Sequence, residues 1–204
     1  MRQPFLIRSG LLSGALIVLF LAGALAACSS GQAGQPGAGS LRTVLTRGKP
    51  AVASGSVSPG QPAEFTAYVD NLAGDPVTLV SASLIPIAGH PAGHLAAVAV
   101  SQRRGPIGFA RGWPPLTPVV PFAGARIGHG RADLVFAMAG ARPGTNYMAA
   151  GLAILYRYHG HRYTLRAYAA SVACVTGASG QAGPACSAAA RQAGQATQRL
   201  AARS

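Results

Sequence analysis

The middle of this chain, from Gln61 to Val175, consists of short runs of β-branched and aromatic residues divided by clusters of turn residues. In the first run Phe65, Ala67 and Val69 alternate with polar or mixed residues, which gives an extended segment one apolar face. We expect strands over four such runs: 63–70, 76–87, 94–101 and 132–138. Short strands at this spacing are typical of an all-β sandwich, and we place that domain at residues 59–176.

A β-hairpin is predicted between Gly151 and Tyr168, where two alternating runs meet at His159-Gly160. A glycine in a two-residue loop supplies the positive φ that a type I′ turn needs, and this turn fixes the register of the two strands. The register places five pairs of residues opposite one another: Tyr158–His161, Arg157–Arg162, Tyr156–Tyr163, Leu155–Thr164 and Ile154–Leu165. Opposed residues share a face of the sheet. One face is therefore aromatic and aliphatic and suited to a core, with Ile154, Tyr156, Tyr163 and Leu165.

The opposite face of this hairpin carries Arg157, Arg162 and Arg166. Like charges directly opposed on a ladder destabilise it unless water or an external anion neutralises them. Two interpretations follow. The face is either an ordinary solvated surface or a stripe that binds anions.

The segment just before the hairpin, Ala141-Arg142-Pro143-Gly144-Thr145-Asn146-Tyr147, resembles the corner of fibronectin type III and related immunoglobulin-like domains. In those domains the tyrosine hydroxyl bonds back to the corner backbone, and the next strand pairs with the last one. The resemblance covers residues 133–176. It implies that Tyr147 has this structural role and that the domain is a single immunoglobulin-like β-sandwich.

An apolar run from Leu11 to Ala27 follows Arg2 and Arg8 and ends in Leu25-Ala26-Ala27-Cys28. This ending resembles the lipobox of bacterial lipoproteins. The resemblance implies a signal peptide at residues 1–27, diacylation of the Cys28 thiol, and a lipid-anchored protein on the extracytoplasmic side of the cell membrane. Two alternatives remain: an uncleaved transmembrane helix, although the run is short for about 30 Å of hydrocarbon, and ordinary signal cleavage with an incidental Cys28.

The segments that flank the predicted sandwich differ from it in composition. Residues 28–58 are rich in Gly, Ala, Ser and Pro, which favours a flexible tether, with a short strand at 41–45 as an alternative. Residues 177–204 permit a helix but show no convincing apolar stripe, so we expect a mobile tail. Inside the domain, residues 103–130 form the longest irregular stretch. There Arg111 and Trp113 are candidates for a contact loop, and Trp113 could instead cover one end of the core.

Removal of residues 1–27 leaves 177 residues and takes two of the 17 basic residues but none of the 4 acidic ones, so the mature chain carries a formal charge of +11. A positive exported surface is attracted to anionic lipid or wall polymers. The exported location argues against nucleic acid as the partner of this positive charge.

With Cys28 lipidated, Cys174 and Cys186 remain as an even pair, for which we expect a disulfide that fastens the C-terminal segment to the last strand. A redox pair and metal thiolates are the alternatives.

The motifs that would indicate an enzyme are missing from the sequence. It has no G-x-S-x-G, no H-E-x-x-H and no phosphate-binding glycine loop, and its four carboxylates form no recognisable pair. The histidines His90, His94, His159 and His161 are weak candidates for copper or zinc ligands. We therefore expect a non-enzymatic, membrane-anchored binding or envelope-associated module without a cofactor. A lipoprotein that binds a metal or a small solute is the alternative.

Overall fold

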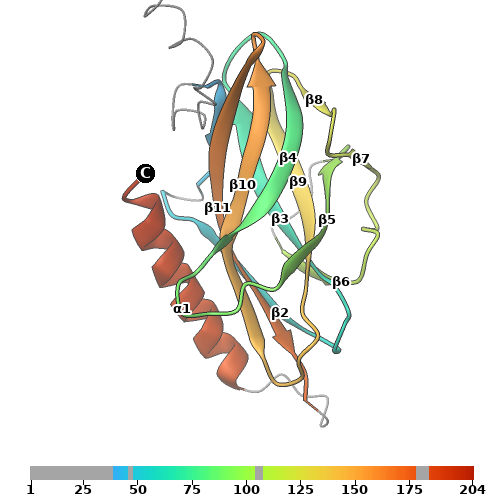
Figure 1. The fold of residues 1–204 in the computed structure, drawn as a ribbon, viewed down its shortest axis with the longest axis vertical. Helices are drawn as coiled ribbons and strands as arrows, with labels where there is room; N and C mark the ends of the chain where they lie inside the picture. Colours follow the sequence, from blue (N-terminus) through green and yellow to red (C-terminus); the bar gives the residue numbers. More distant parts are fainter. Residues whose placement is uncertain (1–38, 46–47, 104–107, 178–183) are drawn as a thin grey trace, which may run out of the picture. The chain divides into compact units, whose positions relative to one another are not determined.

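The computed structural model describes residues 39–45, 48–103, 108–177 and 184–204. Most of them form two β-sheets (Figure 1). The first sheet follows the order β1 (Leu41–Thr43), β3 (Ala63–Asn71), β9 (Gly130–Ala139), β5 (His94–Ser101) and β7 (Val119–Pro121), and β6 (Phe109–Arg111) also pairs with β3. The second sheet follows the order β2 (Ala51–Val57), β11 (His161–Val175), β10 (Asn146–Tyr158), β4 (Val77–Pro86) and β8 (Arg126–Ile127).

The order of the strands is that of an immunoglobulin-like sandwich. In the lettering of immunoglobulin domains, strands B to G correspond in order to β3, β4, β5, β9, β10 and β11. One sheet then contains the neighbours B, E and D (β3, β9 and β5), and the other contains C, F and G (β4, β10 and β11). Among the strands of the described residues, every pairing is antiparallel except that of β2 with β11, which is parallel. The prediction of an all-β immunoglobulin-like fold is confirmed.

The core lies between the inner faces of the two sheets. Phe65, Ala67 and Val69 of β3 are buried, as their alternation predicts, and they belong to one apolar cluster with Ile154 and Tyr156 of β10. The connection from β3 to β4 crosses between the sheets at residues 71–75. It is held by the buried side chain of Asn71, whose Nδ2 donates hydrogen bonds to the carbonyls of Asp75 and Ile127, each at 3.0 Å.

The predicted hairpin forms in the predicted register, with all five residue pairs opposed as expected. His159 (φ 48°) and Gly160 (φ 78°) both have the positive φ of a type I′ turn. The rings of Tyr156 and Tyr163 stack on the core side with their centroids 5.6 Å apart. Local turn chemistry therefore determines the register of the longest strand pair.

The prediction of a flexible tether over residues 28–58 is wrong for its second half. Leu41 in β1 and Val57 in β2 are buried, and β2 extends the second sheet along β11. Backbone hydrogen bonds to an existing sheet form these strands, so a sequence of Gly, Ser and Ala with few apolar residues suffices. The sandwich therefore begins by Leu41 and not at residue 59, while residues 28–38 lie outside the described part of the chain.

The stretch 103–130 is also more regular than its sequence suggests, because it contains the short strands β6, β7 and β8. Each is two or three residues long, which is too short to produce a periodic pattern. Trp113 follows β6 and is partly exposed, and within the described residues it is not among the side chains that pack on either apolar cluster. This position does not support its alternative role as a cover for the core.

The prediction of a mobile C-terminal tail is wrong, and this is the largest correction to the predicted fold. Residues Pro184–Ala201 form the helix α1, which packs on the outer face of the second sheet (Figure 1). The side chains that contact the sheet recur at intervals of three and four: Cys186, Ala189, Ala193, Ala196 and Leu200. Alanine lets a helix approach a sheet closely but adds little to a hydropathy pattern, so the sequence does not reveal this stripe. Among the described residues, no helix has the length and apolar character needed to cross a membrane.

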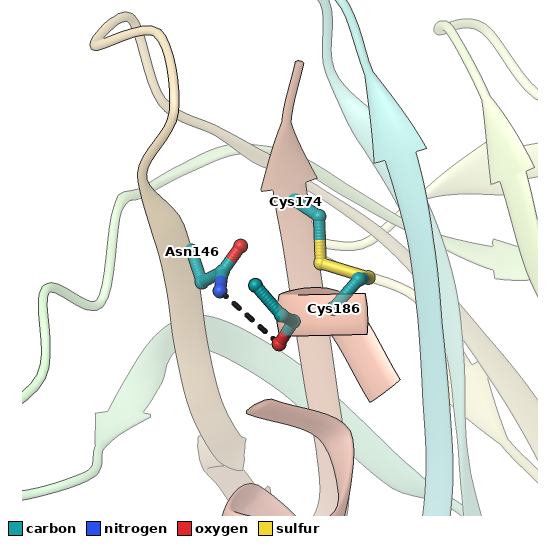
Figure 2. The surroundings of a disulfide bond; sticks show 4 residues. Asn146, Cys174 and Cys186 are labelled. Atoms are coloured by element: carbon teal, nitrogen blue, oxygen red, sulfur yellow. Dashed lines mark hydrogen bonds between the residues drawn. A yellow bond between two sulfur atoms is a disulfide. The ribbon is translucent and has the colours of Figure 1, made fainter. Parts of the chain in front are cut away.

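The predicted disulfide between Cys174 and Cys186 is present, with an S–S distance of 2.05 Å (Figure 2). It joins the end of β11 to the first turn of α1. Beside it, the Nδ2 of Asn146 donates a hydrogen bond of 3.5 Å to the carbonyl of Ala185. Both contacts act on the N-terminal end of the helix.

We expect Cys174→Ala combined with Cys186→Ala to lower the free energy of unfolding by about 3 kcal/mol, because the bond closes a short loop and removes freedom from the unfolded chain. Urea unfolding of oxidised wild type and of the double variant measures the difference. Amide hydrogen exchange should show α1 losing protection before β10 does. An unchanged midpoint together with unchanged exchange in α1 would contradict the assigned role of the disulfide.

Candidate anion-binding face

A row of arginines crosses the outer face of the second sheet. In register, Arg162 of β11 lies opposite Arg157 of β10, Arg157 lies opposite Thr78 of β4, and Thr78 lies opposite Arg126 of β8. Directly opposed residues share a face. We call these four residues the arginine row.

The burial of neighbouring residues shows that the row faces outward. Tyr156, Leu79 and Ile127 each adjoin a member of the row along the chain, and all three are buried in the core between the sheets. Because successive side chains of a strand point to opposite faces, the arginines point away from that core, and all of them are exposed. Arg166 lies on the same side of β11, opposite Ala153.

The helix α1 marks the limit of this exposed region. Further along the same side of β11, Tyr168, Ala170 and Val172 are buried in the apolar cluster beneath α1. The outer face of the second sheet is thus divided into one half that the helix covers and another that carries Arg157, Arg162 and Arg166. This division explains why β11 changes from charged to apolar residues on one face.

The arginine row has no carboxylate partner within the described chain, which includes all four acidic residues. Asp133 pairs with Arg131, whose Nε lies 3.0 Å from its Oδ1, and Asp75 pairs with His159 at 3.3 Å. No ion pair is formed by Arg126, Arg157 or Arg162 among these residues. Adjacent strands are about 4.8 Å apart, so the three guanidinium groups start from backbone positions that span roughly 15 Å. Their mutual repulsion favours binding of an anion with several charges.

The tyrosines behind the row belong to the core. Burial raises the pKa of Tyr156, while a hydrogen bond from the Leu41 backbone acts in the opposite direction. This hydroxyl therefore stays protonated and structural at neutral pH.

Tyr147 lies at the other end of β10, and its hydroxyl accepts a hydrogen bond of 3.1 Å from the backbone N–H of Arg142. That is the contact which the resemblance to immunoglobulin-like corners implies.

The candidate metal-ligating histidines are not brought together. His159 lies in the two-residue turn of the β10–β11 hairpin and His161 is the first residue of β11, whereas His90 and His94 lie beyond the far end of β4. His90 Nε2 is 2.9 Å from Gln192 Nε2 on α1, and His129 Nδ1 is 3.2 Å from the carbonyl of Ala73. In the part of the chain that the structure describes, no group of three or more His, Cys, Asp or Glu residues could hold a metal ion. The arrangement therefore gives no support to the metal-binding alternative.

The candidate contact loop lies next to a second surface feature. Arg111 lines a hollow of about 380 Å³ on the first sheet, together with Phe109, Leu116, Glu64 and Asp133. Burial raises the pKa of Glu64. Leu116 is fully exposed at its rim. Trp113 is not among the residues that line this hollow.

Sequence reasoning found Arg157, Arg162 and Arg166 but missed Arg126 and Thr78. The two-residue strand β8 carries no periodicity, and its pairing with β4 joins positions 48 residues apart in the sequence, such as Thr78 and Arg126. A local pattern could not show that these residues share a face with the hairpin. The folded sheet therefore adds Arg126 to the predicted stripe of Arg157, Arg162 and Arg166.

Comparison with known proteins adds little to this description. No family model matches the chain, and no curated protein matches it. Among solved structures, the chain is similar to the ASH/PapD-like domain of human CEP192 (PapD-like domain 7), with 13% sequence identity and a TM-score of 0.32. The similarity covers 68% of this chain and 87% of that chain. The strand order described above, and not this likeness, is the basis for the fold class.

Proposed function

We propose that this protein is an exported lipoprotein, anchored through a diacylated Cys28, whose immunoglobulin-like domain binds polyanions of the cell envelope without catalysing a reaction. The observation that carries the proposal is the row formed by Arg162, Arg157 and Arg126, which lacks carboxylate partners in the described chain. The ligand class follows from charge. The candidates are phosphate-rich polymers of the wall and anionic lipid head groups.

Arginine suits such ligands for a physical reason. A guanidinium group presents a planar fork of N–H donors that matches two phosphate oxygens at once. Three such groups on a rigid sheet start with their backbone positions fixed, so binding a multivalent anion has to order only the side chains. Exposed charges are screened by salt, and the affinity should fall as ionic strength rises.

The test of this function uses soluble inorganic polyphosphate as the probe. We expect Arg157→Gln combined with Arg162→Gln to weaken binding at least tenfold in calorimetry at low salt, because two of the three charges in the row are lost. The matched control is Arg191→Gln combined with Arg199→Gln, which removes the same charge from exposed positions on α1. Equal losses in the two variants would mean that net charge and not the row governs binding. No loss in either would overturn the function.

A further inference from the structure

The described chain enters the sandwich at the end that carries the arginine row. Gly39 lies against Tyr156, because a Cβ added at Gly39 would lie 1.6 Å from the Tyr156 hydroxyl oxygen. Tyr156 is the immediate neighbour of Arg157 in β10. Two residues after Gly39, Leu41 pairs with Asn71 at the end of β3.

Other contacts place the same group of loops at this end. The Asn71 side chain bonds to the carbonyl of Ile127, which follows Arg126 in β8. Asp75, in the loop after β3, lies 3.3 Å from His159 at the tip of the hairpin. The entry point of the chain, the hairpin tip and the arginine row therefore lie together, and we call this the hairpin end.

The charge of the hairpin end is predominantly positive. Besides the row, Arg42 and Arg131 both lie opposite Asp70 in register, and Arg131 also forms an ion pair with Asp133. The third carboxylate near this end, Asp75, is paired with His159. Cations therefore outnumber carboxylates, and each carboxylate already has a basic neighbour.

The length of chain before the entry point limits how far this end can lie from an anchor. Ten residues, 29–38, separate Cys28 from Gly39. Even a fully extended chain of this length spans only about 40 Å. A surface held this close to its ligand meets an effective concentration on the order of millimolar, so a weak contact is strongly populated.

From these observations we infer that the hairpin end docks on the anionic phospholipid head groups of the membrane that holds the protein. This inference rests on the proposed lipid anchor and on the proposed affinity for polyanions. The arginine row contacts lipid phosphates, and the opposite end of the sandwich, with Arg111 and Trp113, faces away from the bilayer. Each arginine near an anionic surface is worth about a fivefold gain in binding.

The experiment measures the orientation of the lipidated mature protein, residues 28–204, on lipid vesicles. The vesicles consist of phosphatidylcholine with or without phosphatidylglycerol and contain a fluorescence quencher on the head groups. Trp113 is the single tryptophan of the chain and reports the far end, since Gly112 donates a hydrogen bond to the carbonyl of Pro62, next to the start of β3. His161→Trp in a Trp113→Phe background reports the hairpin tip. We expect quenching at the tip on anionic vesicles, little quenching there on neutral ones, and little at Trp113 on either.

Substitution of the row should remove the orientation but not the anchor. We expect Arg157→Gln with Arg162→Gln to reduce quenching at the tip to the level seen on neutral vesicles, while the protein still floats with the vesicles. The control, Arg191→Gln with Arg199→Gln, should leave quenching at the tip unchanged. Hydrogen exchange of the unmodified protein provides a second measurement, with protection gained at residues 155–164 on anionic vesicles. Equal quenching at both ends, or tip quenching that is independent of Arg157 and Arg162, overturns the docking.

The outcomes separate this inference from the function beneath it. Row-dependent binding of polyphosphate without tip quenching refutes membrane docking and leaves a wall polymer as the ligand. Failure to bind polyphosphate refutes the proposed polyanion binding itself. Failure to float with vesicles of either composition refutes the anchor.

Discussion

Replacement of Cys28 by serine is expected to abolish lipid attachment completely. Leu25-Ala26-Ala27-Cys28 resembles the lipobox of bacterial lipoproteins. In those proteins a thioether joins the cysteine sulfur to a diacylglyceryl group, and the chain is cleaved before the cysteine after this modification. A serine hydroxyl is a far weaker nucleophile than a thiol, because the thiol ionises near neutral pH and the hydroxyl does not. The expected effect is therefore all or none.

Intact mass spectrometry of chains expressed in a bacterial host distinguishes the three interpretations of the N-terminal segment. For a lipoprotein, the wild type has the mass of residues 28–204 plus a diacylglyceryl group, while Cys28→Ser stays uncleaved at this site. For ordinary signal cleavage, both chains are shortened and neither carries lipid. For an uncleaved transmembrane helix, both retain all 204 residues. Ser29→Ala is the matched control and should be processed like the wild type.

Gly151→Ala should destabilise the domain by about 3 kcal/mol or more. The glycine has a φ of 136°, which side-chain-bearing residues rarely adopt, and an added Cβ would lie 2.0 Å from the carbonyl oxygen of Ala167 on the paired strand. Neither problem can be relieved by rotating a side chain, because the obstacle is backbone. β10 and β11 must separate locally to make room.

The position matters because Gly151 lies at an irregularity in the pairing of β10 with both of its neighbours. Ala149 and Leu152 both face the main core, although strict alternation would put them on opposite faces, while Met148 and Ala150 face α1. The bulge allows Ala149 and Leu152 to face the main core together. Loss of the bulge would move one of these two residues out of the main core.

Thermal and urea unfolding measure the cost, with Gly74→Ala as the control. A Cβ added at Gly74 would meet no atom within 4 Å, and Gly74 is not among the glycines of positive φ, so its substitution should leave the midpoint nearly unchanged. If Gly151→Ala were as stable as Gly74→Ala, the register irregularity would have no structural role.

The sequence was most informative where structure depends on near neighbours. His159-Gly160 defines a two-residue turn, and that turn sets every pair from Tyr158–His161 to Ile154–Leu165. The alternation in β3 likewise predicts its buried face. Turn geometry and period-two patterning act over a few residues, so they can be inferred without knowledge of the fold.

What the sequence did not reveal depends on distant partners or on small side chains. β2 becomes a strand because β11 offers it hydrogen bonds, and Arg126 joins the row because β8 pairs with β4. The helix α1 buries alanines, whose contribution lies in close approach and not in hydropathy. For the candidate anion-binding face, the hairpin register could place Arg157, Arg162 and Arg166 together, but the addition of Arg126 and the position of the row next to the chain entry could not be predicted.

The disulfide holds only the N-terminal end of α1, and this determines the order in which the turns of the helix unfold. Cys174 and Cys186 hold its first turn, while its last turn is held by weaker contacts, among them Leu200 on the sheet and the hydroxyls of Ser204 and Tyr168. Fraying therefore starts at the C-terminus and proceeds toward the disulfide, one turn at a time. An exopeptidase would trim the chain progressively, and the apolar cluster beneath the helix would be uncovered from the Tyr168 side first.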